Sequence, residues 1–168
     1  MTRFAVRLPQ HQARLVALAI AYHLSRPGSE LDPNTLSDYA HGLRELQPSI
    51  EGQLYSESAA LELIPLQTVL LATALSSVVS ELKMYSVFDT MSGASRRPRS
   101  TAPGFDERLR LLFPAIAGDA EYASQLAEDV TMLRRELPSA RAREVIAEEK
   151  QAAEAARSRK RWWQVWKR

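Results

Sequence analysis

The feature that most constrains this chain is a stretch of eighteen residues without a charged side chain, residues 63–80. A segment this long and apolar lies either in a membrane or in the core of a fold. Hydroxyl and amide side chains dilute it, which favours a central core helix; they are Gln67, Thr68, Thr73, Ser76, Ser77 and Ser80. Because a proline inside a helix costs about 3 kcal/mol, we expect the helix to begin at Pro65 and to run to about Phe88.

The apolar positions of this helix fall on nearly every side of it. The main predicted stripe consists of Leu66, Val69, Leu70, Ala74, Val78, Leu82 and Tyr85. A second set, Leu71, Leu75 and Val79, covers much of the remaining surface. We therefore expect this helix to be the most buried element.

The first residues of the chain fit either a short extended segment or the frayed start of a helix, and a helix follows them. Residues 3–8 alternate apolar with polar or small side chains, which allows a short β pair with residues 59–64. Pro9 suits the start of a helix that runs to about Ser25, where the sequence RPGS ends it. An aliphatic residue, a proline and an Ala/Leu-rich helix recur 56 residues later, which hints at an internal duplication.

Caps and prolines divide the rest of the chain. The sequence DPNTLSDYAHGLRELQP predicts a helix capped by Asp32 and ended by Pro48. The sequence FDERLRLLF predicts a short helix that stops at Pro114. Asp119 then caps a helix with an apolar stripe of Tyr122, Leu126, Val130, Leu133 and Leu137.

After Pro138 the chain has strong helix formers but few large apolar residues. Val145 and Ile146 can dock on the body, whereas only alanines are available beyond them. We therefore expect the last helix to project from the body.

These segments predict a mainly α fold of five to six helices, with a compact bundle-like body and a projecting C-terminal helix. We divide the chain into a helical core (1–90), a flexible basic linker (91–104), a helical segment that packs on the core (105–137) and the projecting helix (138–168). The absence of cysteine excludes disulfides and thiolate chemistry.

The net charge of +2 conceals an asymmetry. Residues 157–168 carry six basic side chains and no acidic one, so residues 1–156 have a net charge of −4. The field that attracts an anionic partner is therefore local to the C-terminal tail.

Three tryptophans lie among these basic residues, and in a helix they fall at positions i, i+1 and i+4. Indole rings suit the headgroup boundary of a bilayer, and each nearby basic residue adds about 1 kcal/mol on an anionic leaflet. In composition the tail resembles the short terminal amphipathic helices that bring some bacterial proteins to the inner membrane. The predicted partner-binding residues are Arg157, Arg159, Lys160, Arg161, Trp162, Trp163, Trp166, Lys167 and Arg168.

The same tail fits other partners. Tryptophans that stack on bases and arginines that neutralise phosphates would make a nucleic-acid-binding protein, with the linker residues Arg96, Arg97 and Arg99 as a secondary basic patch. The tryptophans could also anchor in a groove of another protein. A fourth interpretation is that they fold back and close the core of the body.

No motif indicates catalysis or a cofactor. Asp38, His41 and Glu45 share a helix face, but a metal site needs further ligands from another helix, so we expect a solvated face and no metal. His11 and His23 would be about 18 Å apart on one helix, too far to act together. The glycines form no phosphate-binding loop.

We therefore expect a non-enzymatic interaction or regulatory protein without cofactors. Its predicted location is the cytoplasm, peripheral on the inner membrane face through the tail. A small nucleic-acid-binding protein is the alternative. Because one short anchor binds a membrane weakly, we also expect a homodimer, in which two anchors act together.

Overall fold

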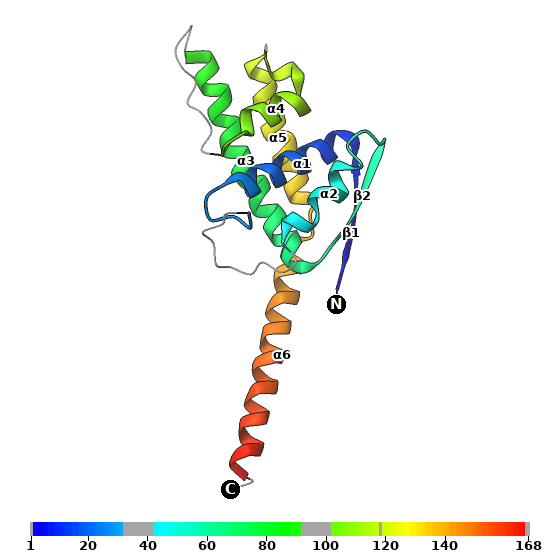
Figure 1. Ribbon diagram of the computed structural model, residues 1–168, viewed down its shortest axis with the longest axis vertical. Helices are drawn as coiled ribbons and strands as arrows, with labels where there is room; N and C mark the ends of the chain where they lie inside the picture. The colour runs from blue at the N-terminus through cyan, green and yellow to red at the C-terminus, as the bar shows by residue number, and fades with distance from the viewer. Residues whose placement is uncertain (1, 32–41, 92–101, 118, 167–168) are drawn as a thin grey trace.

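The computed structural model describes residues 2–31, 42–117 except 92–101, and 119–166 (Figure 1). For residues 86–91, 117, 120 and 158–166 it describes the backbone alone. The described residues form six α-helices, two short 3-10 turns and a two-stranded sheet. This arrangement confirms the predicted mainly α fold.

The predicted β pair is present. Strands β1 (Phe4–Pro9) and β2 (Ser58–Leu63) are antiparallel, with Phe4 opposite Leu63 and Leu8 opposite Ala59. Every second residue of β2 is buried, as expected for a sheet with one face on the core.

Each strand is followed by a helix at a proline. Pro9 ends β1 and precedes α1 (Gln10–Ser25), and Pro65 begins α3 (Pro65–Met91) just after β2. The sequence likeness at an offset of 56 residues therefore corresponds to two strand–proline–helix units. These units meet through the paired strands and through the contact between α1 and α3.

The first of these helices has the longest buried run in the described chain. Residues 15–20 of α1 are buried without a break, because α3, α4, α5 and the sheet surround this helix. We expected the helix from Pro65 to be the most buried element, and this is wrong: no stretch of consecutive buried residues in the described part of α3 is as long as the one in α1.

The structure confirms one part of the predicted stripe of α3 and corrects another. Ala74, Val78 and Leu82 of the stripe are buried, but Leu66 is 38% exposed, and Leu71 and Leu75 of the second set are fully buried. A helix that is apolar nearly all round carries no pattern that marks its inner face. By length and composition α3 is the one described helix that could cross a membrane, over Pro65–Tyr85; in this fold it packs against α1, α5 and α6.

The segment around Pro48 differs from the prediction. The chain forms a 3-10 turn, η1 (Leu43–Glu45), and then α2 (Gln47–Glu51), in which Pro48 is the second residue. Proline lacks an N–H that the first turn of a helix does not need, so it begins this helix instead of ending one. The predicted cap Asp32 lies outside the described residues.

The second half of the body follows the predicted pattern. Helix α4 (Phe105–Leu112) ends before Pro114, which opens the 3-10 turn η2 (Pro114–Ala117). Asp119 caps α5 (Ala120–Glu136), and its Oδ1 accepts hydrogen bonds from the backbone N–H groups of Glu121 (2.9 Å) and Tyr122 (3.3 Å). The predicted stripe of α5 is buried from Leu126 onward and packs along α3.

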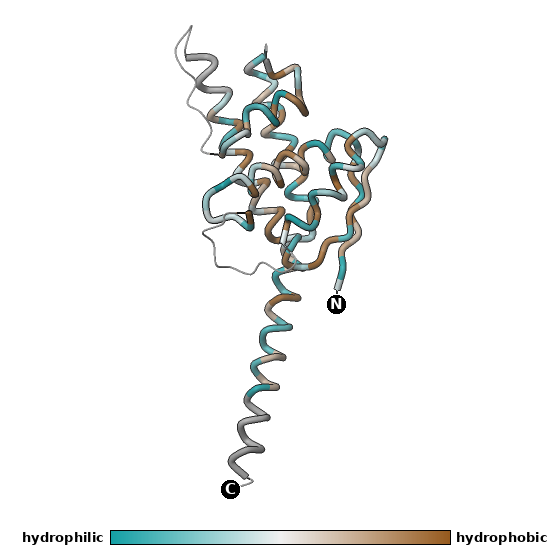
Figure 2. The backbone as a smooth tube through the Cα atoms, in the orientation of Figure 1, coloured by the Kyte–Doolittle hydropathy of each residue, from teal (hydrophilic) through white to brown (hydrophobic). Residues whose placement is uncertain are grey.

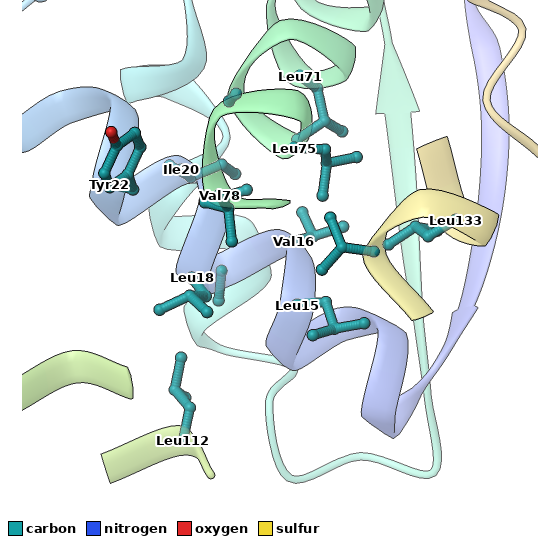
Figure 3. Close-up of a cluster of buried hydrophobic side chains, with 14 of the residues drawn as sticks. Leu15, Val16, Leu18, Ile20, Tyr22, Leu71, Leu75, Val78, Leu112 and Leu133 are labelled. Atoms are coloured by element: carbon teal, nitrogen blue, oxygen red, sulfur yellow. The ribbon is translucent and has the colours of Figure 1, made fainter. Parts of the chain in front are cut away.

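Leucine, isoleucine and valine side chains from the first, third, fourth and fifth helices meet in one core (Figure 3). Figure 2 shows apolar residues concentrated where the helices of the body cross, whereas α6 (Ser139–Trp166) is largely hydrophilic beyond the body up to residue 157. The body is thus complete without the distal part of its last helix.

Candidate interaction surface on the C-terminal helix

Up to residue 157, the last one whose side chain is described, helix α6 touches the body only near its start. Ala142 and Val145 are buried, Ile146 is half-buried, and these first turns pack against α3. Every residue from 147 to 157 is exposed; we call this segment the stalk. Figure 1 shows α6 continuing away from the body as one helix, as the sequence predicts.

Local chemistry explains why the stalk is helical without a core. Alanine, glutamate, lysine and arginine are strong helix formers, and they make up most of it. Arg141 lies 2.8 Å from Glu144 and 3.5 Å from Glu148, so three charges are joined along one side of the helix. The hydrogen bond from Arg141 to Glu144 raises the pKa of the guanidinium.

The predicted tail residues lie at the far end of this helix. Arg157 is exposed at the end of the stalk. The backbone is helical through six further predicted residues, Arg159, Lys160, Arg161, Trp162, Trp163 and Trp166. Lys167 and Arg168 lie outside the described residues. At 1.5 Å per residue, Trp162 is about 25 Å farther along the axis than Val145.

The other predicted patches are only partly covered. Arg96, Arg97 and Arg99 lie outside the described residues, as do Asp38 and His41. Glu45, the remaining member of the Asp38/His41/Glu45 face, is an exposed residue of η1. In the part of the chain that the structure describes, no group of three or more histidine and acidic side chains is placed to hold a metal ion.

Two histidine–carboxylate pairs escaped the sequence analysis. The Nε2 atom of His11 lies 2.8 Å from Oδ2 of Asp129, which ties α1 to α5 at the surface. The Nε2 atom of His23 lies 3.5 Å from Oε1 of Glu30, a carboxylate that is only 4% exposed. Burial lowers the pKa of His23, although Glu30 opposes this shift. The partners are far apart in sequence or separated by a turn, so local periodicity carried no signal for them.

Sequence analysis also missed four arginines around the junction of α5 and α6. Arg134, Arg135, Arg141 and Arg143 line an open groove of about 920 Å³ together with hydroxyl side chains of α3. The signal was present in the sequence RRELPSARAR, which has four arginines on the two sides of a proline. The sequence did not show that α3 forms the third side of the groove, because the α3 residues that line it precede Arg134 by more than fifty positions.

The structure thus offers a basic groove at the root of α6, and the sequence places a run of basic residues at the far end of the same helix. Comparison of the chain with protein-family models, with curated proteins and with solved structures found no match.

Proposed function

We propose that this is a non-enzymatic interaction or regulatory protein whose C-terminal helix attaches the body to an anionic membrane surface, such as the inner face of the cytoplasmic membrane. The observation that carries the proposal is the course of α6. Its stalk is exposed over residues 147–157, and the helix continues to Trp166, so the basic tryptophan segment is held beyond the body.

Helical geometry gives the tail two sides. At about 100° per residue, positions 162, 163 and 166 fall within an arc of about 100°. Positions 160 and 161 fall outside that arc and carry Lys160 and Arg161, whereas Arg159 falls inside it, one turn before the indoles. Indoles on one side with cations around them are the composition of a helix that lies in a bilayer interface.

The length of the stalk matters because most of the chain is acidic and the proposed partner surface is anionic. Residues 1–156 carry a net charge of −4, so an anionic membrane repels the body. Screening at physiological ionic strength has a length of about 8 Å. Trp162 lies about 25 Å along the helix from Val145, about three times this length, so the negative charge of the body hardly weakens the attraction between the basic tail and an anionic surface.

Tryptophan fluorescence tests the proposal directly, because the only three tryptophans lie in the tail. We expect red emission from the free protein and a blue shift on adding vesicles of phosphatidylglycerol and phosphatidylcholine. Vesicles of phosphatidylcholine alone should have little effect. Because the indoles are buried in the interface, part of the shift should survive high salt.

Two triple variants separate the tail from the body in vesicle sedimentation. Trp162→Ala/Trp163→Ala/Trp166→Ala should abolish binding to anionic vesicles. Tyr55→Ala/Leu111→Ala/Met132→Ala removes three exposed apolar side chains from the body and should leave binding unchanged. Emission that is blue in the free protein and insensitive to vesicles would contradict the proposal. A response to single-stranded DNA alone would establish the nucleic-acid alternative.

A further inference from the structure

The groove at the root of α6 is an open concave surface lined by four arginines. Three elements form it: the last turn of α5, the first turns of α6 and the outer side of α3. Its charged lining consists of Arg134, Arg135, Arg141 and Arg143. No carboxylate is among its lining residues, although the body as a whole is acidic.

Most of these arginines lack an acidic partner. Arg134 donates from Nη1 to the Oγ of Ser76 at 3.0 Å. Arg141 alone is paired, with Glu144 and Glu148. Within the described ranges, no carboxylate lies at ion-pair distance from Arg134, Arg135 or Arg143. The groove therefore holds positive charge that no carboxylate among the described residues neutralises.

The dipoles of α5 and α6 act differently on the two pairs of arginines. Arg134 and Arg135 lie in the last turn of α5, where cations stabilise a helix. Arg141 and Arg143 lie in the first turns of α6, where cations oppose the dipole, and the first turn of α6 has no acidic residue to compensate. The second pair is thus unfavourable for the helix that carries it.

The start of α6 also has backbone donors to offer. Pro138, which precedes the helix, has no side-chain acceptor, and in the described structure no acceptor bonds the N–H groups of Ala140 or Arg141. Both residues line the groove. A bound anion would accept from these groups and would also offset the charge of Arg141 and Arg143.

We propose that this groove binds the phosphate group of a small ligand, either a free phosphate compound or a lipid headgroup. Guanidinium groups match phosphate oxygens in pairs, and the groove presents them from two helices. The hydroxyls of Ser80 and Ser139, which also line it, add polar contacts. A volume of about 920 Å³ accommodates a ligand larger than a single phosphate. This proposal does not depend on membrane attachment by the tail.

Such a ligand would join α6 to the body. The helix is otherwise docked through the buried Ala142 and Val145 alone, with Ile146 half-buried beside them. A phosphate held by arginines of α5 and α6 would fix the angle at which the stalk leaves the body. Binding at the root could thereby set the position of the tail.

Titration calorimetry of the full chain with pyrophosphate, and separately with inorganic phosphate, tests the site at constant ionic strength. We expect saturable binding of pyrophosphate to one site, without a change in tryptophan emission, since the tail is distant. Arg134→Gln/Arg135→Gln/Arg143→Gln should weaken binding about 100-fold, because at least two charge-assisted contacts are lost. The matched control Arg7→Gln/Arg44→Gln/Arg110→Gln removes the same charge from other exposed positions and should bind as the unaltered protein does.

The single variant Arg143→Gln serves if the triple variant loses helicity by circular dichroism, with an expected loss of about tenfold. Weaker binding to phosphatidic acid vesicles in the groove variant, but not in the control, would identify a lipid headgroup as the source of the phosphate. Pyrophosphate binding with unchanged vesicle binding would identify a soluble ligand. Three outcomes would overturn the proposal. The groove and control variants could bind pyrophosphate with equal affinity, or no probe could bind saturably. The third is that the groove variant loses only its binding to single-stranded DNA.

Discussion

One buried carboxylate organises the chain after α1. Glu30 accepts hydrogen bonds from the backbone N–H groups of Leu43 (2.8 Å) and Arg44 (2.9 Å), and His23 lies beside it. A charged group that is only 4% exposed needs such partners, since an unpaired buried charge is strongly unfavourable. The side chain of Glu30 thus fixes the start of η1.

This cluster predicts a pH dependence of stability. Burial lowers the pKa of His23 below 6.5, and Arg26 adds to the shift while Glu30 opposes it. Below pH 6.5 the unfolded chain therefore binds a proton that the folded protein resists, so the free energy of unfolding should fall as the pH drops. Urea unfolding between pH 7.5 and 5.5 measures this slope.

The substitution His23→Gln should flatten that slope in the same pH window. The control His11→Gln removes a half-exposed histidine from the same helix and should keep the slope. An identical slope in the unaltered protein and in His23→Gln would show that another group causes the dependence.

The carboxylate of Glu30 also explains why position 42 is a glycine. A Cβ atom at position 42 would overlap the carboxylate of Glu30. We expect Gly42→Ala to displace Glu30 and to destabilise the protein by about 1–3 kcal/mol, the cost of leaving buried polar groups unpaired. Gly52→Ala, where the nearest atom to the new Cβ is 3.4 Å away, should change the free energy of unfolding by less than about 0.5 kcal/mol. Equal effects in urea unfolding would count against this explanation.

Among the elements, α5 depends on its cap. Asp119 satisfies two backbone N–H groups at the start of the helix that packs along α3. We expect Asp119→Ala to lower the free energy of unfolding by about 1 kcal/mol and Asp119→Asn to preserve most of it, because asparagine caps as well as aspartate does. Chemical denaturation of the two variants makes the comparison, and equal losses would contradict a capping role.

Elements with a local chemical signal were predictable from the sequence. Asp119 precedes a regular apolar stripe, and Pro65 can only begin the long helix, so both boundaries were found. Pro48 misled, because a proline is compatible with the end of one helix and with the start of the next. Leu66 misled because α3 is apolar on several sides, so only its neighbours α1 and α5 decide which side is buried.

The contacts that shape the candidate sites were beyond such reasoning. Arg134 meets Ser76 across 58 residues of sequence, and His11 meets Asp129 across 118. The helical course of α6 to its far end was predictable, because its residues are mostly strong helix formers. The groove at the root was not, since it exists only where α3, α5 and α6 converge.

At the scale of the whole molecule, the core and the stalk are built on different principles. The two strand–proline–helix units, with α4 and α5, bury leucines from every side. The stalk buries nothing and is helical mainly through intrinsic propensity, with one ion pair from Arg141 to Glu148 at its start. The stability of the body and the distance at which α6 holds its far end therefore depend on different residues. A change in the stalk need not alter the stability of the body.

This separation predicts the effect of removing the distal helix. A chain that ends after residue 147 keeps Ala142, Val145 and Ile146, the residues that dock α6 on α3. Because residues 148–157 are exposed, the free energy of unfolding of the body should change by less than about 0.5 kcal/mol. As a matched change at the dock, Val145→Ala in the full chain should cost about 1 kcal/mol or more, since it removes buried methyl groups. Urea unfolding followed by far-ultraviolet circular dichroism measures both. A loss above about 1.5 kcal/mol on truncation would mean that the end of α6 packs on the body, and the stalk could then not hold the tryptophans away from it.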